Sequence, residues 1–183
     1  MEYDKIKNIY PTGARAAGQT AYTGRAGRVR RAQEVHTMSE NMQQDVLRVL
    51  LSEEEIRAKC KEMGARISQE YKGKNLMLVT VLKGAVVFLA DLMRAIDVPA
   101  EIDFMVVSSY GSGVKSSGVV KIVKDLDVPL AGKDLLIVED ILDSGLTLSY
   151  IKELLASRGP ASIKIATLLD KPSRRKVDLV ADY

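Results

Sequence analysis

The feature that most constrains this chain is an apolar segment that ends abruptly in acidic residues. Residues 134–138 (DLLIV) are almost continuously apolar, as expected of a strand covered on both faces. Glu139, Asp140 and Asp143 follow at once, and a helical pattern begins near Leu146. A strand that turns into a helix N-terminus in this way puts carboxylates beside unpaired backbone N–H groups. Such a site can bind sugar hydroxyls or a metal-bound ligand with its acids and a phosphate with its amides.

The rest of the chain alternates between strand and helix patterns. Ser52 and Glu55 form a capping box that begins a helix, and Lys72-Gly73-Lys74 ends it. Further helices are predicted at 85–96 and 146–157, and strands at 76–82, 102–108, 119–123, 134–138, 162–169 and 177–180. This order predicts an α/β fold, an open, mostly parallel twisted sheet flanked by helices.

Three polar features follow predicted strands directly: Lys83-Gly84, the turn at 139–147 and Asp170-Lys171. In open α/β sheets, ligands bind beyond the carboxyl ends of the strands. Since all three features fall at such ends, they predict one shared site.

The turn itself offers several donors. Ser144, Gly145, Leu146 and Thr147 supply backbone N–H groups and two hydroxyls, and Gly145 allows close backbone approach. Each helix-terminus contribution is only about 0.3–1 kcal/mol when exposed, so the donors must act together to hold a phosphate. The alternative is a simple helix cap formed by Asp143 or Ser144.

The adjacent carboxylates of Glu139 and Asp140 repel each other. Vicinal ribose hydroxyls, or Mg²⁺ bridging to a diphosphate, would relieve that repulsion; a structural ion pair with Lys or Arg is the alternative. Asp143, at the mouth of the turn, is a candidate general base or a stabiliser of developing positive charge.

The candidate cations are less specific. Lys83 could neutralise a diphosphate leaving group, and Lys171 could donate to a carbonyl of a heterocycle, but either could equally be a solvated lysine. Lys115, Ser116 and Ser117 lie in a glycine-rich stretch that is either a lid over an anionic ligand or an ordinary loop. The sequence contains neither a Walker A motif nor a Gly-x-Gly-x-x-Gly after a strand, which argues against a P-loop nucleotidase and an NAD enzyme.

Charge is unevenly distributed. Residues 1–37, the basic leader, carry seven Lys/Arg and three acids, which leaves 20 basic and 21 acidic residues for the remainder. The leader is predicted to be a disordered basic extension, either an arm for RNA or anionic surfaces or an upstream extension before a start at Met38 or Met42. Nucleic-acid binding by the core is not indicated. The only histidine, His36, lies in the leader, so histidine acid–base catalysis in the core is not expected.

The remaining bulk features set broad limits. At 183 residues, with 46% hydrophobic residues, the chain fits one globular domain. Its single cysteine, Cys60, is predicted to be a small buried residue and favours a reducing, cytoplasmic setting. No apolar run is long enough to span a membrane, so no membrane partner is expected.

Residues 136–147 (LIVEDILDSGLT) resemble the phosphoribosyl-diphosphate binding motif of the type I phosphoribosyltransferases. The Glu-Asp pair is similar to that of the 6-oxopurine branch. Further matches to the family lie at 81–85, 103–111, 115–118 and 168–172, so the resemblance defines a phosphoribosyltransferase domain at 42–183.

The resemblance implies purine salvage: the 5-phosphoribosyl group passes from phosphoribosyl diphosphate to hypoxanthine or guanine, with Mg²⁺, giving the nucleoside monophosphate and diphosphate. It implies that Asp143 is catalytic, that Glu139 and Asp140 engage the ribose and the metal, and that Lys171 reads the 6-oxo group. It further implies a 5′-phosphate loop at Ser144 to Thr147, with Gly145 and Leu146 between them. It also implies a diphosphate loop at Lys83 and Gly84 with a cis peptide after Leu82, and a lid at Ser109 and Tyr110.

Two departures from the family stand out. The leader has no recognised counterpart, and the sequence stops at Tyr183, before the aromatic residue that stacks on the purine and an aspartate that helps to hold metal. The expectation is a C-terminally truncated chain that binds weakly and turns over poorly. The family is usually oligomeric, so a homo-oligomer is expected. The alternatives are a non-catalytic regulator that senses phosphoribosyl diphosphate and binds nucleic acid through its leader, and an enzyme that prefers xanthine.

Overall fold

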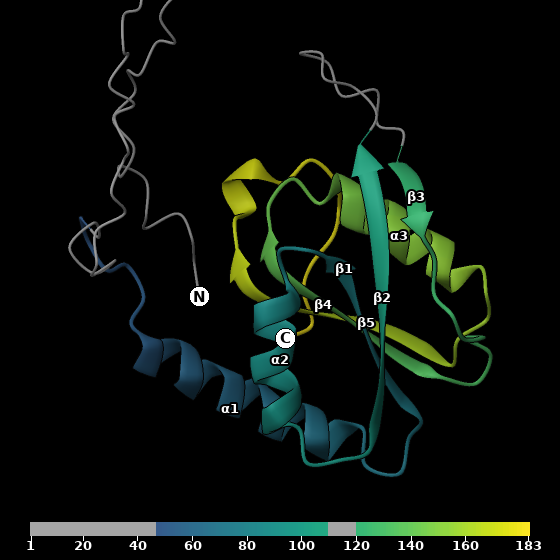
Figure 1. The fold of residues 1–183 in the computed structure, drawn as a ribbon, viewed down its shortest axis with the longest axis horizontal. Helices are drawn as coiled ribbons and strands as arrows, with labels where there is room; N and C mark the ends of the chain where they lie inside the picture. Colours follow the sequence, from purple (N-terminus) through teal and green to yellow (C-terminus); the bar gives the residue numbers. More distant parts are fainter. Residues whose placement is uncertain (1–46, 110–119) are drawn as a thin grey trace, which may run out of the picture. The chain divides into compact units, whose positions relative to one another are not determined.

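A computed structural model describes residues 47–109 and 120–183 of the chain. The basic leader and the predicted lid residues Tyr110 and 115–117 lie outside the described residues. The sheet and its helices belong to one compact unit that includes Ser52–Tyr183. Its elements, labelled in Figure 1, are α1 (Glu53–Glu70), β1 (Leu76–Leu82), α2 (Val86–Ala95), β2 (Ala100–Ser109), β3 (Val120–Lys124), β4 (Asp134–Leu142), α3 (Leu146–Ala156), β5 (Ser162–Asp170) and the short 3₁₀ helix η3 (Pro172–Arg174).

The predicted capping box begins α1. The N–H of Glu55 donates to the Ser52 hydroxyl at 3.2 Å, and the N–H of Ser52 donates to the Glu55 carboxylate at 2.7 Å. Reciprocal bonds of this kind satisfy two N–H groups that the helix itself leaves unpaired. The start of α1 is therefore fixed by local sequence, as predicted.

The five strands form one sheet in the order β3-β2-β1-β4-β5. β1 pairs parallel with β2 and β4, β4 pairs parallel with β5, and β3 alone is antiparallel, which confirms an open, mostly parallel sheet. From β1 the chain crosses to β2 on one side, and from β4 it crosses to β5 on the other. The gap between the carboxyl ends of β1 and β4 is therefore the point where the winding reverses, the usual ligand site of such sheets.

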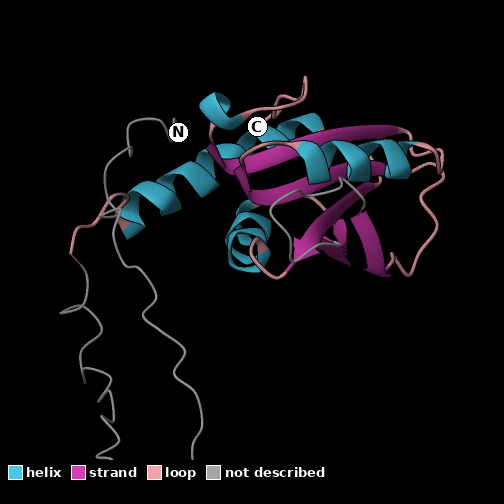
Figure 2. Cartoon of the chain, turned by 90° about the horizontal axis from the view of Figure 1, so that it is seen from above, coloured by secondary structure: helices cyan, strands magenta, loops and turns pink. Residues whose placement is uncertain are grey.

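Alternate side chains of the central strands enter two separate cores. Leu76 and Leu78 of β1 pack with α1 and α2, whereas Met77 and Val79 pack with α3. Because successive strand residues point to opposite faces, a nearly continuous apolar run is what a doubly covered strand requires. Figure 2 shows the strands together with the helices that pack around them. Cys60 of α1 is buried in the first core, as predicted.

Two sequence-based boundaries are wrong. β4 does not end at Val138 but continues to Leu142, because Glu139 and Ile141 stay in register with Thr167 and Leu169 of β5. Residues 177–180 do not form a strand. Instead, the N–H of Leu179 donates to the carbonyl of Val177 at 2.9 Å and closes a tight turn. The side chain of Leu179 is buried in the core between the sheet and α3.

Among the helices that the structure describes, none combines the length and apolar character needed to cross a lipid bilayer.

Candidate active site

A pocket of about 260 Å³ opens at the carboxyl ends of β1 and β4. β4 and the turn into α3 supply most of its wall, and the β1–α2 connection supplies the rest. Its lining residues are Val81, Gly84, Ala85, Glu139, Asp140, Ile141, Leu142, Asp143, Ser144, Gly145, Thr147 and Leu148. Two of the three predicted strand-end features, Gly84 and the acidic turn, thus meet in one cavity.

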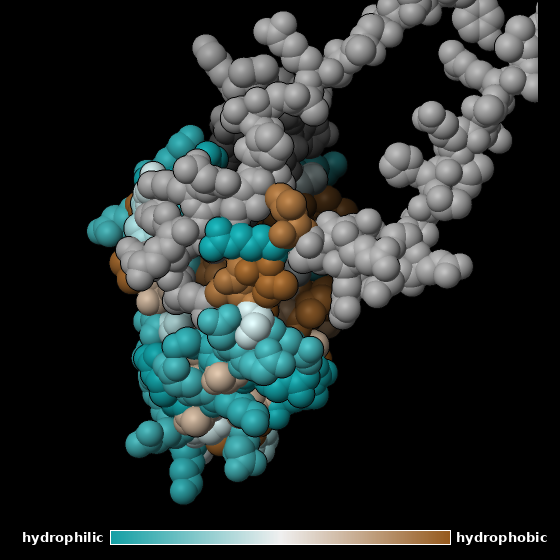
Figure 3. Space-filling model, turned by 90° about the vertical axis from the view of Figure 1, so that its left-hand side faces the viewer, coloured by the Kyte–Doolittle hydropathy of each residue, from teal (hydrophilic) through white to brown (hydrophobic). Residues whose placement is uncertain are grey.

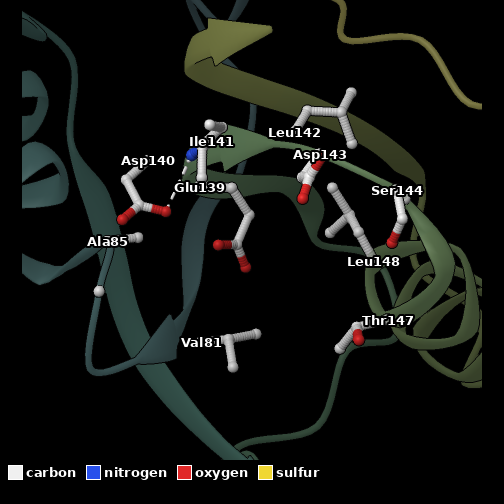
Figure 4. Close-up of a pocket in the computed structure, with 12 residues that line it drawn as sticks. Val81, Ala85, Glu139, Asp140, Ile141, Leu142, Asp143, Ser144, Thr147 and Leu148 are labelled. Carbon is white, nitrogen blue, oxygen red and sulfur yellow. Dashed lines mark hydrogen bonds between the residues drawn. The ribbon is translucent and has the colours of Figure 1, made fainter. Parts of the chain in front are cut away.

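Glu139 and Asp140 occupy the last part of β4 and point in different directions. In Figure 4 the Glu139 carboxylate faces the centre of the cavity, while that of Asp140 turns toward Ala85. Burial, and then the neighbouring charge of Asp140, raise the pKa of Glu139 to about 8, and a backbone hydrogen bond from Val81 offsets this only in part. The protein groups around this pocket therefore disfavour a second negative charge beside Asp140.

Asp140 sits against the start of α2. Its Oδ1 accepts from the N–H of Ile141 at 2.8 Å. Its Oδ2 approaches Gly84 so closely that a Cβ there would lie 2.8 Å away. A side chain at position 84 would therefore require this carboxylate to shift.

Asp143 follows β4, and its side chain points into the same space as Glu139 (Figure 4). Its Oδ1 is buried and accepts no hydrogen bond from the described residues. The nearest cation is Arg174, whose Nε lies 3.4 Å from that oxygen. Because Asp143 lines the pocket, its carboxylate can take up or stabilise a proton on a ligand.

The turn between β4 and α3 is held by Gly145, which has a left-handed φ of 78° and caps the helix. No side chain caps α3, so the alternative in which Asp143 or Ser144 serves as a simple cap is wrong. The hydroxyls of Ser144 and Thr147 point toward the cavity in Figure 4. The first N–H groups of α3 remain available to an anion.

The other predicted residues are placed less uniformly. Leu146 begins α3, but its side chain is exposed and does not line the pocket. Lys83 is exposed and also outside the lining, although the predicted cis peptide between Leu82 and Lys83 is confirmed. Lys171 is not a lining residue, but its N–H donates to the Leu142 carbonyl at 3.0 Å, which places its backbone beside the turn. Ser109 ends β2.

Sequence reasoning missed Arg174 and Arg175. Both follow β5 in the segment that packs behind the acidic turn, where Arg175 Nε donates to the Asp143 carbonyl at 3.1 Å. The sequence did contain a signal for them. Two consecutive arginines follow the end of one strand, and the neighbouring strand ends in acids that they could contact.

The described residues hold no cluster of three or more His, Cys, Asp or Glu side chains arranged to bind a metal on their own. Mg²⁺ is commonly bound through only one or two carboxylates together with substrate phosphates. The raised pKa of Glu139, caused first by burial and then by the charge of Asp140, fits a pair of acids completed by a ligand-borne cation.

The fold and the pocket together define an α/β protein that presents acids and helix-start amides to one ligand. Residues 49–183 match the phosphoribosyl transferase domain. The chain belongs to the phosphoribosyltransferase family.

Relatives and solved structures are consistent with this assignment. The chain is 56% identical to the hypoxanthine-guanine phosphoribosyltransferase of Bacillus subtilis over 142 residues, 78% of this chain and 79% of that protein. It is 51% identical to the Streptococcus thermophilus protein of the same name, over the same shares of each chain. A crystal structure of a Staphylococcus aureus hypoxanthine phosphoribosyltransferase superimposes with a TM-score of 0.75 at 51% identity, covering 80% of this chain and 79% of that one. These matches favour an enzyme over a sensing regulator.

Proposed function

We propose that this chain transfers the 5-phosphoribosyl group from phosphoribosyl diphosphate to hypoxanthine or guanine, with Mg²⁺, and releases diphosphate. The observation that carries the proposal is one pocket lined both by the acids Glu139 and Asp143 and by the hydroxyl residues Ser144 and Thr147 (Figure 4). A ligand with both a sugar and a phosphate uses the acids as well as the hydroxyls and amides of the turn. The names of the relatives support the choice of a 6-oxopurine as acceptor.

The acids receive the sugar. Glu139 and Asp140 accept hydrogen bonds from the vicinal ribose hydroxyls, and together they hold Mg²⁺ through the ligand. The metal, when bound, neutralises charge on the diphosphate. Donors from the ligand would stabilise the charged form of Glu139, whose pKa is raised to about 8 by burial and by the charge of Asp140.

The turn receives the 5′-phosphate. The amides at the start of α3 and the hydroxyls of Ser144 and Thr147 donate to its oxygens. Gly145 lets the backbone approach, and the backbone of Leu146 contributes as the first residue of α3. Binding at this fixed end orients C1′ toward the base.

Asp143 acts on the base. As the bond from C1′ to diphosphate breaks, positive charge develops on the sugar, and the purine N9 attacks C1′. The carboxylate of Asp143, which lines the pocket, accepts the proton that leaves N7 of the purine as N9 bonds to C1′. Lys83 and Gly84 contact the leaving diphosphate, Ser109 and Tyr110 cover the reacting centre, and Lys171 donates to the 6-oxo group.

The setting of the reaction is also part of the proposal. The family domain, at 42–183, works in the cytoplasm, as its single, buried cysteine supports. We expect a homo-oligomer because α2 exposes three large apolar side chains, Val86, Val87 and Met93. Figure 3 shows apolar side chains gathered beside polar surface on one face of the molecule. Light scattering coupled to size exclusion, on the wild type and Val87→Lys, tests this: a monomer at micromolar concentration in both would overturn it.

The reaction is tested by measuring diphosphate release with hypoxanthine, guanine, xanthine and adenine as acceptors, each with phosphoribosyl diphosphate and Mg²⁺. We expect diphosphate release with hypoxanthine and guanine but not with adenine. A chelator that removes Mg²⁺ should abolish the release. Binding of inosine 5′-monophosphate is measured in parallel, so that slow turnover is distinguished from failure to bind. If the chain neither binds inosine 5′-monophosphate nor releases diphosphate, the proposal is overturned. Diphosphate release with xanthine alone would make xanthine the acceptor.

A further inference from the structure

Three consecutive carbonyl groups of the turn after β4 are held from one side. The Leu142 carbonyl accepts from the N–H of Lys171 at 3.0 Å and from Arg175 Nη2 at 3.2 Å. The Asp143 carbonyl accepts from Arg175 Nε at 3.1 Å, and the Ser144 carbonyl accepts from the N–H of Lys176 at 2.9 Å. All of these donors belong to residues 171–176, which we call the brace.

The brace fixes the direction of the amides as well as the carbonyls. In a planar trans peptide, the C=O and the following N–H point in opposite directions. Holding the carbonyls of Leu142, Asp143 and Ser144 toward the brace therefore turns the N–H groups of Asp143, Ser144 and Gly145 away from it. Asp143, Ser144 and Gly145 line the pocket, so these donors face the cavity side of the turn.

Arg175 is the one side chain in the described part of the molecule that donates to these three carbonyls, and it reaches two of them. With two further bonds, four of its five guanidinium N–H groups are engaged. It donates to the Asp170 carboxylate and to the Leu179 carbonyl, and the side chain is only 15% exposed. A planar fork of five donors can make all of these bonds at once, which an ammonium cannot.

The contact between the turn and the brace is also tight. A Cβ at Gly145 would lie 2.9 Å from Val177 Cγ2 and 3.2 Å from Arg175 Cδ. The turn therefore has no room to rotate toward the brace. If the guanidinium of Arg175 were lost, the space it leaves behind the turn would allow the turn to rotate.

We propose that Arg175 is a positioning residue that aims the phosphate-binding amides: it holds the carbonyls of Leu142 and Asp143 so that the N–H groups of Asp143 and Ser144 face the 5′-phosphate. The proposal rests on the proposed function, since it requires a phosphoribosyl ligand in this pocket. Arg175 acts through the backbone and does not itself touch the ligand.

The test compares two ligands that differ only in the phosphate. Dissociation constants for inosine and inosine 5′-monophosphate are measured by calorimetry or NMR titration on the full chain. The ratio of the two constants reports the contribution of the phosphate. The variant Arg175→Lys keeps the charge but loses the fork, so it separates aiming from simple electrostatic attraction.

The matched control is Arg158→Lys. Arg158 also forms a two-pronged ion pair, with Asp125 at 2.8 and 2.7 Å, but it lies outside the pocket lining. Both variants lose stability in thermal unfolding. Only Arg175→Lys is expected to reduce the inosine-to-nucleotide ratio, by about 10- to 100-fold, because one or two charge-assisted hydrogen bonds are misaligned. The amide resonances of Asp143 and Ser144, which are expected to shift when nucleotide binds the wild type, should shift less.

Each outcome decides the matter. An unchanged ratio in Arg175→Lys overturns the positioning role, as does an equal loss for inosine and its nucleotide, which would indicate general damage. A wild type that binds inosine and its monophosphate equally overturns the proposed function itself, and the two failures are thus separable. If Arg175→Lys does not fold, Asp170→Ala, which removes the carboxylate that anchors the guanidinium, serves instead: a lowered ratio supports the inference and an unchanged ratio overturns it.

Discussion

Two acidic side chains in this sheet, Asp103 and Glu139, lie in opposite electrostatic environments. Asp103 of β2 is 7% exposed, yet its pKa is lowered: burial opposes ionisation, but the N–H groups of Asp127 and Phe104 and the Lys124 ammonium outweigh it. Glu139 of β4 meets burial and the charge of Asp140, which raise its pKa to about 8. Asp103, which supports the fold, accepts hydrogen bonds from the folded chain itself. Glu139, which lines the binding pocket, depends on hydrogen-bond donors of the ligand.

The largest effect should come from Asp143→Asn. The amide keeps the shape of the side chain but cannot hold a proton on the purine, so kcat for nucleotide formation should fall about 10²- to 10⁴-fold. Steady-state kinetics with hypoxanthine measure it. The KM for phosphoribosyl diphosphate and the thermal midpoint should change little, and an unaltered kcat would remove Asp143 from the chemistry.

The matched change at the structural carboxylate, Asp103→Asn, should damage folding and spare the pocket. Asp103 accepts from Asp127 N–H at 2.7 Å, Phe104 N–H at 2.7 Å and Lys124 Nζ at 3.3 Å. Loss of its charge weakens all three bonds, which we expect to lower the free energy of unfolding by about 2 kcal/mol. Urea denaturation measures the loss. Nucleotide affinity below the transition should match that of the wild type; a parallel drop in affinity would show that Asp103 supports the site as well.

Glu139→Gln should have the reverse profile. The neutral side chain avoids the cost of burying a charge and the repulsion with Asp140, so the protein without ligand should be as stable as the wild type or slightly more stable at pH 8. Affinity for nucleotide with Mg²⁺ should fall by about 10-fold, since a charged acceptor is lost. Calorimetry with and without Mg²⁺ checks both parts. A large loss of stability would mean that Glu139, like Asp103, is part of the framework.

The sequence predicted the acids and glycines of the pocket better than the parts of the chain that hold them in place. The acids of β4, Gly84 and the turn at Gly145 were found because adjacent residues carry the signal. The end of β4 was misplaced because its last residues are held by pairing with β5, and polarity alone does not report such pairing. Arg175 was missed for a similar reason: its acceptors at the turn are main-chain carbonyls 32 and 33 residues away, which every residue type provides.

The smallest effect, and the most direct comparison of the two carboxylates, is the dependence of stability on pH. The lowered pKa of Asp103 means that its contribution is fully present above about pH 4, its unfolded pKa, and is lost as pH falls through the folded value. Glu139 behaves in the opposite way. Between its unfolded pKa of about 4.3 and its folded pKa of about 8, the native state keeps a proton that the unfolded chain has released, so the free energy of unfolding falls as pH rises through that window.

Unfolding curves at pH 3 to 9 for the wild type, Asp103→Asn and Glu139→Gln separate the two slopes. The stability difference between the wild type and Asp103→Asn should shrink only at the acid end. The difference between Glu139→Gln and the wild type should grow with pH from about 4.3 to about 8 and then level off. A Glu139→Gln difference that does not change with pH would mean that the carboxylate of Glu139 finds a partner in the folded chain, and the contrast between a supporting and a ligand-dependent acid would disappear.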